Sequence, residues 1–179
     1  MPELNFSPFP QLTTERLVLR QLTAADAVDI AALRSNEIVN QYLNRPKKTT
    51  PDDALVFIDK ITKGINNNQS IYWVIAQKEN NHLIGAICLW NIVAAEDRAE
   101  IGYELHPEFH GKGVMQEAMQ AVIDFAFNKM LLKIITAFTT VDNIASIKSL
   151  ERNHFKLDTA GKYTEQDGEE GYVYVLEKM

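Results

Sequence analysis

The fold of this chain is decided by the stretch His106-Pro-Glu-Phe-His-Gly-Lys-Gly-Val-Met-Gln-Glu-Ala118, which places two glycines where an apparent strand ends and a helix begins. Glycine adopts positive φ and lets the main chain approach a ligand closely, and the first-turn amides of a helix lack partners of their own. Gly111 and Gly113 therefore predict a cradle for an anion, with phosphate or pyrophosphate as its natural guest. The pattern is neither GxGxxG nor GxxxxGK[ST], so a turn that only needs flexibility remains the alternative.

Both flanks of this stretch have clear secondary-structure patterns. Upstream, Ala99-Glu-Ile-Gly-Tyr-Glu-Leu105 has the residue types of a strand. Downstream, apolar residues recur at helical spacing and form a broad stripe made of Val114, Met115, Ala118, Met119, Val122, Phe125 and Ala126. A strand, a glycine turn and a helix in this order point the helix N-terminus at the expected anion.

The remainder of the chain alternates helices and strands. Expected helices cover residues 24–35, 37–43, 51–63, 113–129 and 143–153, and expected strands cover 16–21, 70–78, 82–91, 98–105, 133–140, 155–161 and 171–177. The hairpin of 70–78 and 82–91 turns at Asn80-Asn81, whereas the strand-helix-strand link from 98–105 to 133–140 predicts a parallel pair. We therefore expect an α/β fold, in which helices flank a twisted mixed sheet of six to seven strands, antiparallel and then parallel.

The run EIGYELHPEFHGKGVMQEA resembles the central acetyl-coenzyme A binding motif of the GNAT superfamily, in the form carried by RimJ/RimL-type N-acetyltransferases. The usual motif is a glutamine or arginine, two residues, glycine, one residue, then glycine or alanine. His110 replaces the first residue and Met115 the last. Met115 places a long side chain where the superfamily keeps a small one near the pyrophosphate.

Two further segments match the same group in the right order. Thr14–Asp26 is similar to its opening strand and first helix, where Thr23 would cap the helix and Asp26 would complete a capping box. Val141–Phe155 resembles its asparagine-to-serine helix, with His154 where glycine is common. The resemblance spans most of the chain, and its three pieces together are more specific than any one.

The resemblance implies that the parallel strands 98–105 and 133–140 splay apart, so that the pantetheine arm of the coenzyme pairs with the free edge around Glu104–His106. Pantetheine has two amides, which can satisfy the strand N–H and C=O groups that the splay leaves open. The implied coenzyme-binding residues are Glu104, Leu105, His106, His110, Gly111, Lys112, Gly113, Val114, Met115, Asn143 and Ser146.

Amine acetylation needs a base, because a primary amine is mostly protonated at neutral pH. Glu100 is the expected base, since its place before the glycine turn is similar to that of a glutamate used by some superfamily members; Glu104 lies on the same nominal side. Many members use a tyrosine as the acid, but Leu150 occupies that place, so the resemblance assigns Ser146 to the thiolate and Asn143 to the coenzyme. The structural alternatives are that Glu100 and Glu104 are ordinary exposed carboxylates of a strand, and that Asn143 and Ser146 only start a helix.

The leading expectation is an N-acetyltransferase that moves an acetyl group directly from acetyl-CoA to a primary amine. The resemblance implies a protein N-terminal α-amine of the ribosomal-protein type, and a small-molecule amine remains open. The acceptor pocket is expected from residues 35–48, 64–70 and 161–171. A non-catalytic GNAT-like sensor of acyl-CoA, or an assembly module, is the alternative that the departures at His110, Met115 and His154 keep open.

Composition sets the remaining expectations. The 179 residues predict a single domain, and a net charge of -6 argues against a general nucleic-acid binder. No apolar run is long enough to span a membrane, and the single Cys88 suits a reducing compartment as a buried thiol, so a cytoplasmic protein is expected. No metal is expected. The expected oligomeric state is a monomer or a homodimer. The acidic run Glu165–Glu170 is either a solvated loop or an amine-attracting rim.

Overall fold

An antiparallel series of strands and one parallel pair form the centre of the structure. The computed structural model describes residues 4–163 and 171–179, whose strands form one sheet in the order β1-β2-β3-β4-β5-β6-β8-β7. The strands are β1 (Leu12–Thr13), β2 (Leu17–Gln21), β3 (Ile71–Gln77), β4 (Leu83–Val93), β5 (Arg98–Leu105), β6 (Ile134–Thr139), β7 (Lys156–Leu157) and β8 (Tyr172–Glu177). Only the β5–β6 pair is parallel among these neighbours, so the expected mixed sheet is confirmed, with eight strands rather than six to seven because the two-residue β1 was not expected.

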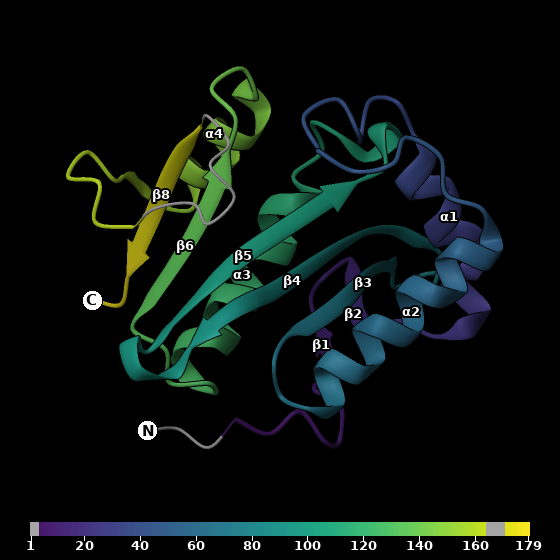
Figure 1. The fold of residues 1–179 in the computed structure, drawn as a ribbon, viewed down its shortest axis with the longest axis horizontal. Coiled ribbons are helices and arrows are strands. Elements are labelled where there is room, and N and C mark those ends of the chain that lie inside the picture. Colours follow the sequence, from purple (N-terminus) through teal and green to yellow (C-terminus); the bar gives the residue numbers. More distant parts are fainter. Residues whose placement is uncertain (1–3, 164–170) are drawn as a thin grey trace.

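Helices cover both faces of this sheet (Figure 1). They are α1 (Ala27–Ser35), α2 (Pro51–Asn66), α3 (Val114–Asn128) and α4 (Ile144–Arg152), with 3₁₀ turns η1 (Ala24–Asp26), η2 (Ala94–Glu96) and η3 (Pro107–Phe109). On one face, Phe57 of α2 meets Tyr72 of β3, with ring centroids 5.7 Å apart. On the other, Phe125 of α3 meets Trp73 of the same strand at 5.4 Å. Neighbouring strand residues point to opposite faces, so these two contacts define an α1/α2 face and an α3/α4 face.

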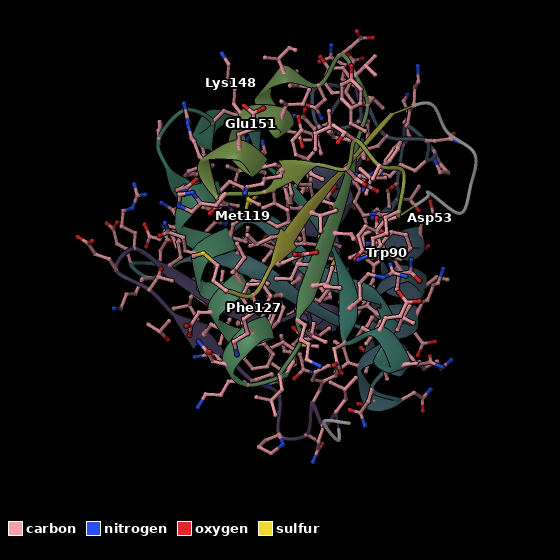
Figure 2. The ribbon with its side chains drawn as sticks, turned by 90° about the vertical axis from the view of Figure 1, so that its left-hand side faces the viewer. Asp53, Trp90, Met119, Phe127, Lys148 and Glu151 are labelled. Carbon is pink, nitrogen blue, oxygen red and sulfur yellow. The ribbon has the colours of Figure 1, made fainter. Side chains whose placement is uncertain are left out.

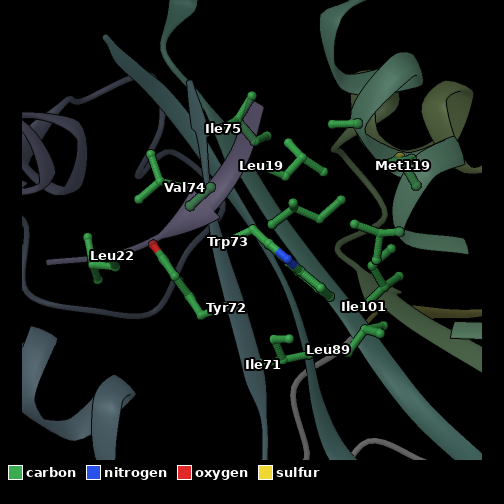
Figure 3. Close-up of a cluster of buried hydrophobic side chains, with 14 of the residues drawn as sticks. Leu19, Leu22, Ile71, Tyr72, Trp73, Val74, Ile75, Leu89, Ile101 and Met119 are labelled. Carbon is green, nitrogen blue, oxygen red and sulfur yellow. The ribbon is translucent and has the colours of Figure 1, made fainter. Parts of the chain in front are cut away.

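The α3/α4 face carries the larger apolar core. Trp73, Leu19, Met119 and Ile101 are fully or almost fully buried there, and Figure 3 shows Tyr72 and Trp73 leaving β3 on different sides. Burying a side chain of this size stabilises the fold by about 1.5–3 kcal/mol. Figure 2 likewise shows Met119 and the half-exposed Trp90 on opposite sides of the sheet.

The largest differences between the sequence-based boundaries and the structure concern three segments, whereas most other ends agree within one or two residues. The helix expected at 37–43 is wrong: residues 37–42 form hydrogen-bonded turns, because the Asn36 side chain accepts from the amides of Ile38 and Val39 and offers the backbone a local alternative to a helix. The strand expected at 155–161 shrinks to Lys156–Leu157, and the helix expected at 51–63 continues to Asn66.

The capping box expected at the first helix is present. The Thr23 amide donates to Asp26 Oδ2 at 2.9 Å, where a 3₁₀ turn leads into α1. The same carboxylate receives two bonds from the Arg20 guanidinium, at 2.9 and 2.8 Å. The start of α1 is thereby tied to strand β2.

The parallel pair separates soon after it forms. Within residues 4–163 and 171–179, β5 and β6 are in register only at Arg98–Ile134, Ala99–Ile135 and Glu100–Thr136. Beyond this point β5 continues to Leu105 and the two strands diverge (Figure 1). The structure therefore has the splay between 98–105 and 133–140 that the resemblance implies.

Candidate active site

The glycine turn at the end of β5 has the backbone geometry that the sequence predicts. Gly111 and Gly113 adopt φ values of +71° and +76°, in the left-handed region that favours glycine. Gly113 is the N-cap residue of α3, and Val114, the first residue of the helix, is buried. The amides of the first turn of α3 therefore begin directly after an open glycine loop, as an anion cradle requires.

The segment before β2 holds this loop in place. Arg16 donates from Nη1 to the Lys112 carbonyl at 3.0 Å and from Nε to Glu117 Oε2 at 2.7 Å. Thr14 Oγ1 donates to Glu117 Oε1 at 2.6 Å. Burial alone would raise the pKa of Glu117, but the bonds from Thr14 and Arg16 outweigh it and lower that pKa. The only carboxylate in the first turn of α3 thus stays ionised and faces Arg16, a contact that the sequence analysis missed.

The structure accommodates the two departures from the usual motif. The His110 ring places Nε2 2.9 Å from the Leu105 carbonyl, which can only accept, so the protonated nitrogen donates there and ties the loop to the end of β5. Met115 is half-buried and packs against the apolar core. Both side chains therefore have structural contacts of their own.

The open edge of β5 is formed by alternate residues. The His106 amide donates to the Ile84 carbonyl at 2.8 Å, so it is engaged with β4. By the alternation of an antiparallel ladder, Glu104 also bonds toward β4, whereas Tyr103 and Leu105 turn their main-chain groups toward the gap. Of the expected edge Glu104–His106, only Leu105 has this orientation, although its carbonyl already accepts from His110, and Tyr103 has the same orientation.

Glu100 lies at the last register pair before the strands diverge. Its side chain is on the α1/α2 face, opposite Trp90 of β4 and beside Thr136 of β6, and the residue is only 9% exposed. Asn91 Nδ2 lies 3.5 Å from Glu100 Oε2. A carboxylate in this position can receive a proton from a group in the gap between the strands.

Glu104, on the same face, has a strong partner. Arg45 Nη2 lies 2.6 Å from Glu104 Oε2, and the two side chains are 15% and 10% exposed. Arg45 also donates from Nε to Asn40 Oδ1 at 2.7 Å, and Asn40 donates to the Arg34 carbonyl. The ion pair therefore pins the loop after α1 onto the sheet.

The start of α4 meets β5 from the other face. The Asn143 side chain caps the helix by accepting a hydrogen bond from the Ser146 amide at 3.1 Å. This is the helix-start role that the sequence analysis names as the alternative to coenzyme binding. Ser146 Oγ lies 2.6 Å from the hydroxyl of Tyr103. Burial raises the pKa of Tyr103 to about 12, which the Ser146 bond only partly offsets, so the phenol keeps its proton at neutral pH. Leu150 is 0% exposed and belongs to the core.

Other sequence expectations fall outside this site. Burial, together with Glu104, raises the pKa of Cys88 to about 12, which makes it an unreactive thiol. In the part of the chain that the structure describes, no group of three or more His, Cys, Asp or Glu side chains could hold a metal ion, and no helix is long and apolar enough to cross a membrane. The acidic run Glu165–Glu170, and with it most of the expected acceptor range 161–171, lies outside the described residues.

The groups of this site are ordered along β5, from an anion-binding end to a reactive end. An anion cradle lies at the end of β5, and an edge with open main-chain groups leads from it toward the point where the strands diverge. There, a buried carboxylate occupies one face and a hydroxyl pair the other. Such a site can hold a long phosphate-bearing molecule and move protons on both sides of its reactive end.

Comparison with known proteins agrees with this geometry. A model of the acetyltransferase (GNAT) domain matches residues 16–156. The uncharacterized N-acetyltransferase YoaA of Bacillus subtilis is 32% identical over 161 residues, which make up 89% of this chain and 91% of the relative.

Solved structures show the same fold. The ribosomal-protein-S5-alanine acetyltransferase from Vibrio fischeri superposes with a TM-score of 0.78 at 25% identity, over 94% of this chain and 96% of that one. RimL, a ribosomal L7/L12 alpha-N-protein acetyltransferase in complex with coenzyme A, gives a TM-score of 0.81 at 20% identity, over 94% and 98%. Because the family model covers most of the sequence, the chain belongs to the GNAT family of N-acetyltransferases.

Proposed function

We propose that this chain transfers an acetyl group from acetyl-CoA directly to a primary amine, within a ternary complex. The observation that carries the proposal is the divergence of β5 and β6 after Glu100, with Glu100 on one face and the Tyr103–Ser146 pair on the other. Direct transfer is favoured because the only cysteine, Cys88, is partly buried rather than fully buried as expected, and its raised pKa disfavours an acyl-cysteine route.

The residues fit acetyl-CoA in order along β5. The cradle of Gly111, Gly113 and the first turn of α3 would bind the pyrophosphate, and the main-chain groups of Leu105 and Tyr103 would pair with the pantetheine amides. The RimL structure contains coenzyme A in a chain of the same fold, which supports this placement. The thioester, which supplies the activated acetyl group, would then lie where the strands separate.

The proton transfers follow from this placement. Glu100, directly or through water, takes a proton from the attacking amine, which forms the new C–N bond from the α1/α2 face. As the C–S bond breaks, Ser146 donates its hydroxyl proton to the sulfur from the α3/α4 face. Tyr103, protonated at neutral pH, donates a hydrogen bond to Ser146 Oγ and acts as a positioning residue. As the products leave, Glu100 releases its proton to solvent and Ser146 regains one from solvent, which restores both groups.

The acceptor is a primary amine of one of two kinds. A protein N-terminal α-amine is supported by the two solved structures, which are named for ribosomal-protein acetylation. A small-molecule amine fits the same chemistry, since the base and the gap make no demand on the rest of the acceptor. The α1/α2 face, from which the amine attacks, is called the acceptor face below. Arg34, Arg45 and Tyr72 lie on it, and the charge and hydrogen-bonding groups of these residues decide which kind of amine fits.

The proposal is tested by calorimetric titration with acetyl-CoA and coenzyme A, followed in the same samples by thiol release. The acceptors are a panel of primary amines and N-terminal peptides. We expect binding of both ligands and thiol release that requires an amine. Binding without release from any acceptor would contradict transfer and favour an acyl-CoA sensor, and failure to bind acetyl-CoA would contradict the coenzyme site.

A further inference from the structure

A second cationic group lies beside the ion pair of Glu104 and Arg45. Electrostatic interactions link Arg34, at the end of α1, to Arg45, Glu104 and Tyr72. Both guanidinium groups therefore interact with one carboxylate, but among the described residues only Arg45 is in direct ion-pair contact with it, so the positive charge of Arg34 is in excess of this pair. A partly buried charge without a counter-ion is unfavourable, and a bound anion would relieve it.

The hydrogen-bonding groups of this cluster are also incompletely used. The Arg34 guanidinium lies 4.0 Å above the Phe57 ring, and it donates no hydrogen bond to another residue in the described ranges. Tyr72 is 7% exposed, and its buried hydroxyl has no hydrogen-bond partner among those same residues. Phe57 lies against both groups, since its ring centroid is 5.7 Å from that of Tyr72. Fork-shaped donors and a nearby hydroxyl form a set that matches two oxygens of an anion.

We propose that Arg34 and the Tyr72 hydroxyl bind a carboxylate of the amine acceptor, so that this enzyme acetylates amines that carry an acid group. The inference rests on the proposed function, because it assigns the acceptor a second recognition group. A monoanion suits the single excess charge better than a dianionic phosphate, which would also face Glu104. Burial and then Arg45 lower the pKa of Arg34, as expected for a guanidinium that lacks its anion.

The sheet sets the length of such an acceptor. Tyr72 pairs with Cys88 and Cys88 with Gly102, so Tyr72 lies two strands across and two residues along from Glu100. With strands ~4.8 Å apart and a rise of ~3.3 Å per residue, these two positions on the sheet are separated by roughly 12 Å, which sets the approximate distance from the amine to the carboxylate. A short ω-amino acid, or a peptide with an acidic side chain near its N-terminus, provides that spacing.

The test uses dead-end complexes, so it does not depend on catalysis. In the presence of saturating coenzyme A, calorimetry compares ω-amino acids, from 4-aminobutyrate to 8-aminooctanoate, with the carboxamides of the same length. We expect at least one acid to bind about tenfold more tightly than its carboxamide. Equal affinities at every length, or no binding by any acid, would overturn the inference.

Variants identify the responsible residues. In Arg34→Gln, and in Tyr72→Phe, which keeps the ring against Phe57, the ratio of the affinity for the acid to the affinity for its carboxamide should fall toward one. In Lys129→Gln, which removes an exposed positive charge after α3, the ratio should persist. A ratio that survives Arg34→Gln would overturn the inference.

Thiol release separates this inference from the proposed function. Transfer to amines and carboxamides without preference for acids would remove the carboxylate site and leave the transferase intact. Selective acid binding without thiol release from any amine would support the carboxylate site and contradict the transferase. Peptides beginning Ser-Ala-Asp or Ser-Ala-Asn then distinguish a peptide source of the carboxylate from a small molecule.

Discussion

Glu100 and Glu104 differ in where they lie along β5. Glu104 lies near the end of the strand with its Oε2 2.6 Å from Arg45 Nη2, so its loss would leave a largely buried guanidinium without its partner. Glu100 lies at the last register pair before β5 and β6 part, where the thioester is proposed to lie. We therefore propose Glu100 as the base and a structural role for Glu104.

Glu100→Gln should lower kcat by about 10²- to 10⁴-fold, because the amide cannot take a proton from the amine. Glu104→Gln is the matched variant, and its effect should appear mainly as a lower Tm, with a loss of about 1–3 kcal/mol of stability. Equal losses of kcat in the two variants would contradict the assignment.

Ser146→Ala should reduce turnover by about 10²-fold or more while acetyl-CoA affinity, measured by calorimetry, changes much less. Tyr103→Phe should give a smaller loss of kcat, because it removes only the bond that orients Ser146. Ser149→Ala, one turn along α4, controls for a change in the helix itself. Wild-type turnover in Ser146→Ala would remove the acid role.

At the scale of elements, the proposed coenzyme cradle depends on two segments that are distant in sequence. The glycine loop and the first turn of α3 supply the amides, and Arg16, before β2, holds the Lys112 carbonyl and Glu117. Arg16 Nη2 also lies 3.5 Å from where a Cβ at Gly113 would stand. The cradle is therefore a joint product of the helix N-terminus and the N-terminal segment.

Gly113→Ala should weaken acetyl-CoA binding, because a side chain at φ +76° both strains the loop and narrows the pyrophosphate path. Gly161→Ala is the control, since Gly161 has a similar φ of +63° but lies in another loop with open space around it. Both variants should lose about 1 kcal/mol of stability. Only Gly113→Ala should raise the Kd for the coenzyme, and an unchanged Kd would argue against the cradle.

The link from β2 to α1 should make stability depend on pH. Burial raises the pKa of Asp26, but bonds from Arg20 and Thr23 outweigh it, and the net pKa lies below its ordinary value of 3.8. The unfolded chain therefore takes up the proton first, so this contribution is present above about pH 4 and is lost as pH falls through the lowered pKa.

Asp26→Asn should therefore lower the stability by about 1–3 kcal/mol at pH 7, and the Tm difference from wild type should narrow as the solution is acidified to pH 3. Thermal unfolding at a series of pH values measures this difference. Asp29→Asn, at an exposed position of the same helix, controls for the added amide. A Tm difference that widens on acidification would contradict the sign.

For the whole molecule, periodicity in the sequence predicts the helices and strands better than it predicts the contacts between their side chains. The strand 98–105 is confirmed to the residue, because an alternating pattern between a turn and a glycine loop has clear ends. The helix at 37–43 was wrong because Asn36 and Asn40 bond to nearby main-chain groups, which a hydrophobic pattern does not show. Strand β1, only two residues long, carries too little pattern to be predicted.

In the candidate site as well, local geometry was predictable from the sequence and contacts between distant segments were not. The positive φ of Gly111 and Gly113 was predictable, because it is a property of one local turn. The pairs Tyr103–Ser146, Arg45–Glu104 and Arg16–Glu117 were missed, since each joins residues that only the strand order brings together. Alternation along β5 did indicate that Tyr103 faces away from Glu100, but not that Ser146 would meet it.

The central claim is that acetyl-CoA lies in the gap between β5 and β6, with its thioester between Glu100 and Ser146. A crystal structure of the complex with acetyl-CoA tests it most directly. The account predicts that the pyrophosphate is bound at Gly111–Val114, that the pantetheine amides bond to the main chain of Tyr103 and Leu105, and that the sulfur lies within hydrogen-bonding reach of Ser146 Oγ. A coenzyme bound elsewhere, or a sulfur on the α1/α2 face beside Glu104, would contradict it.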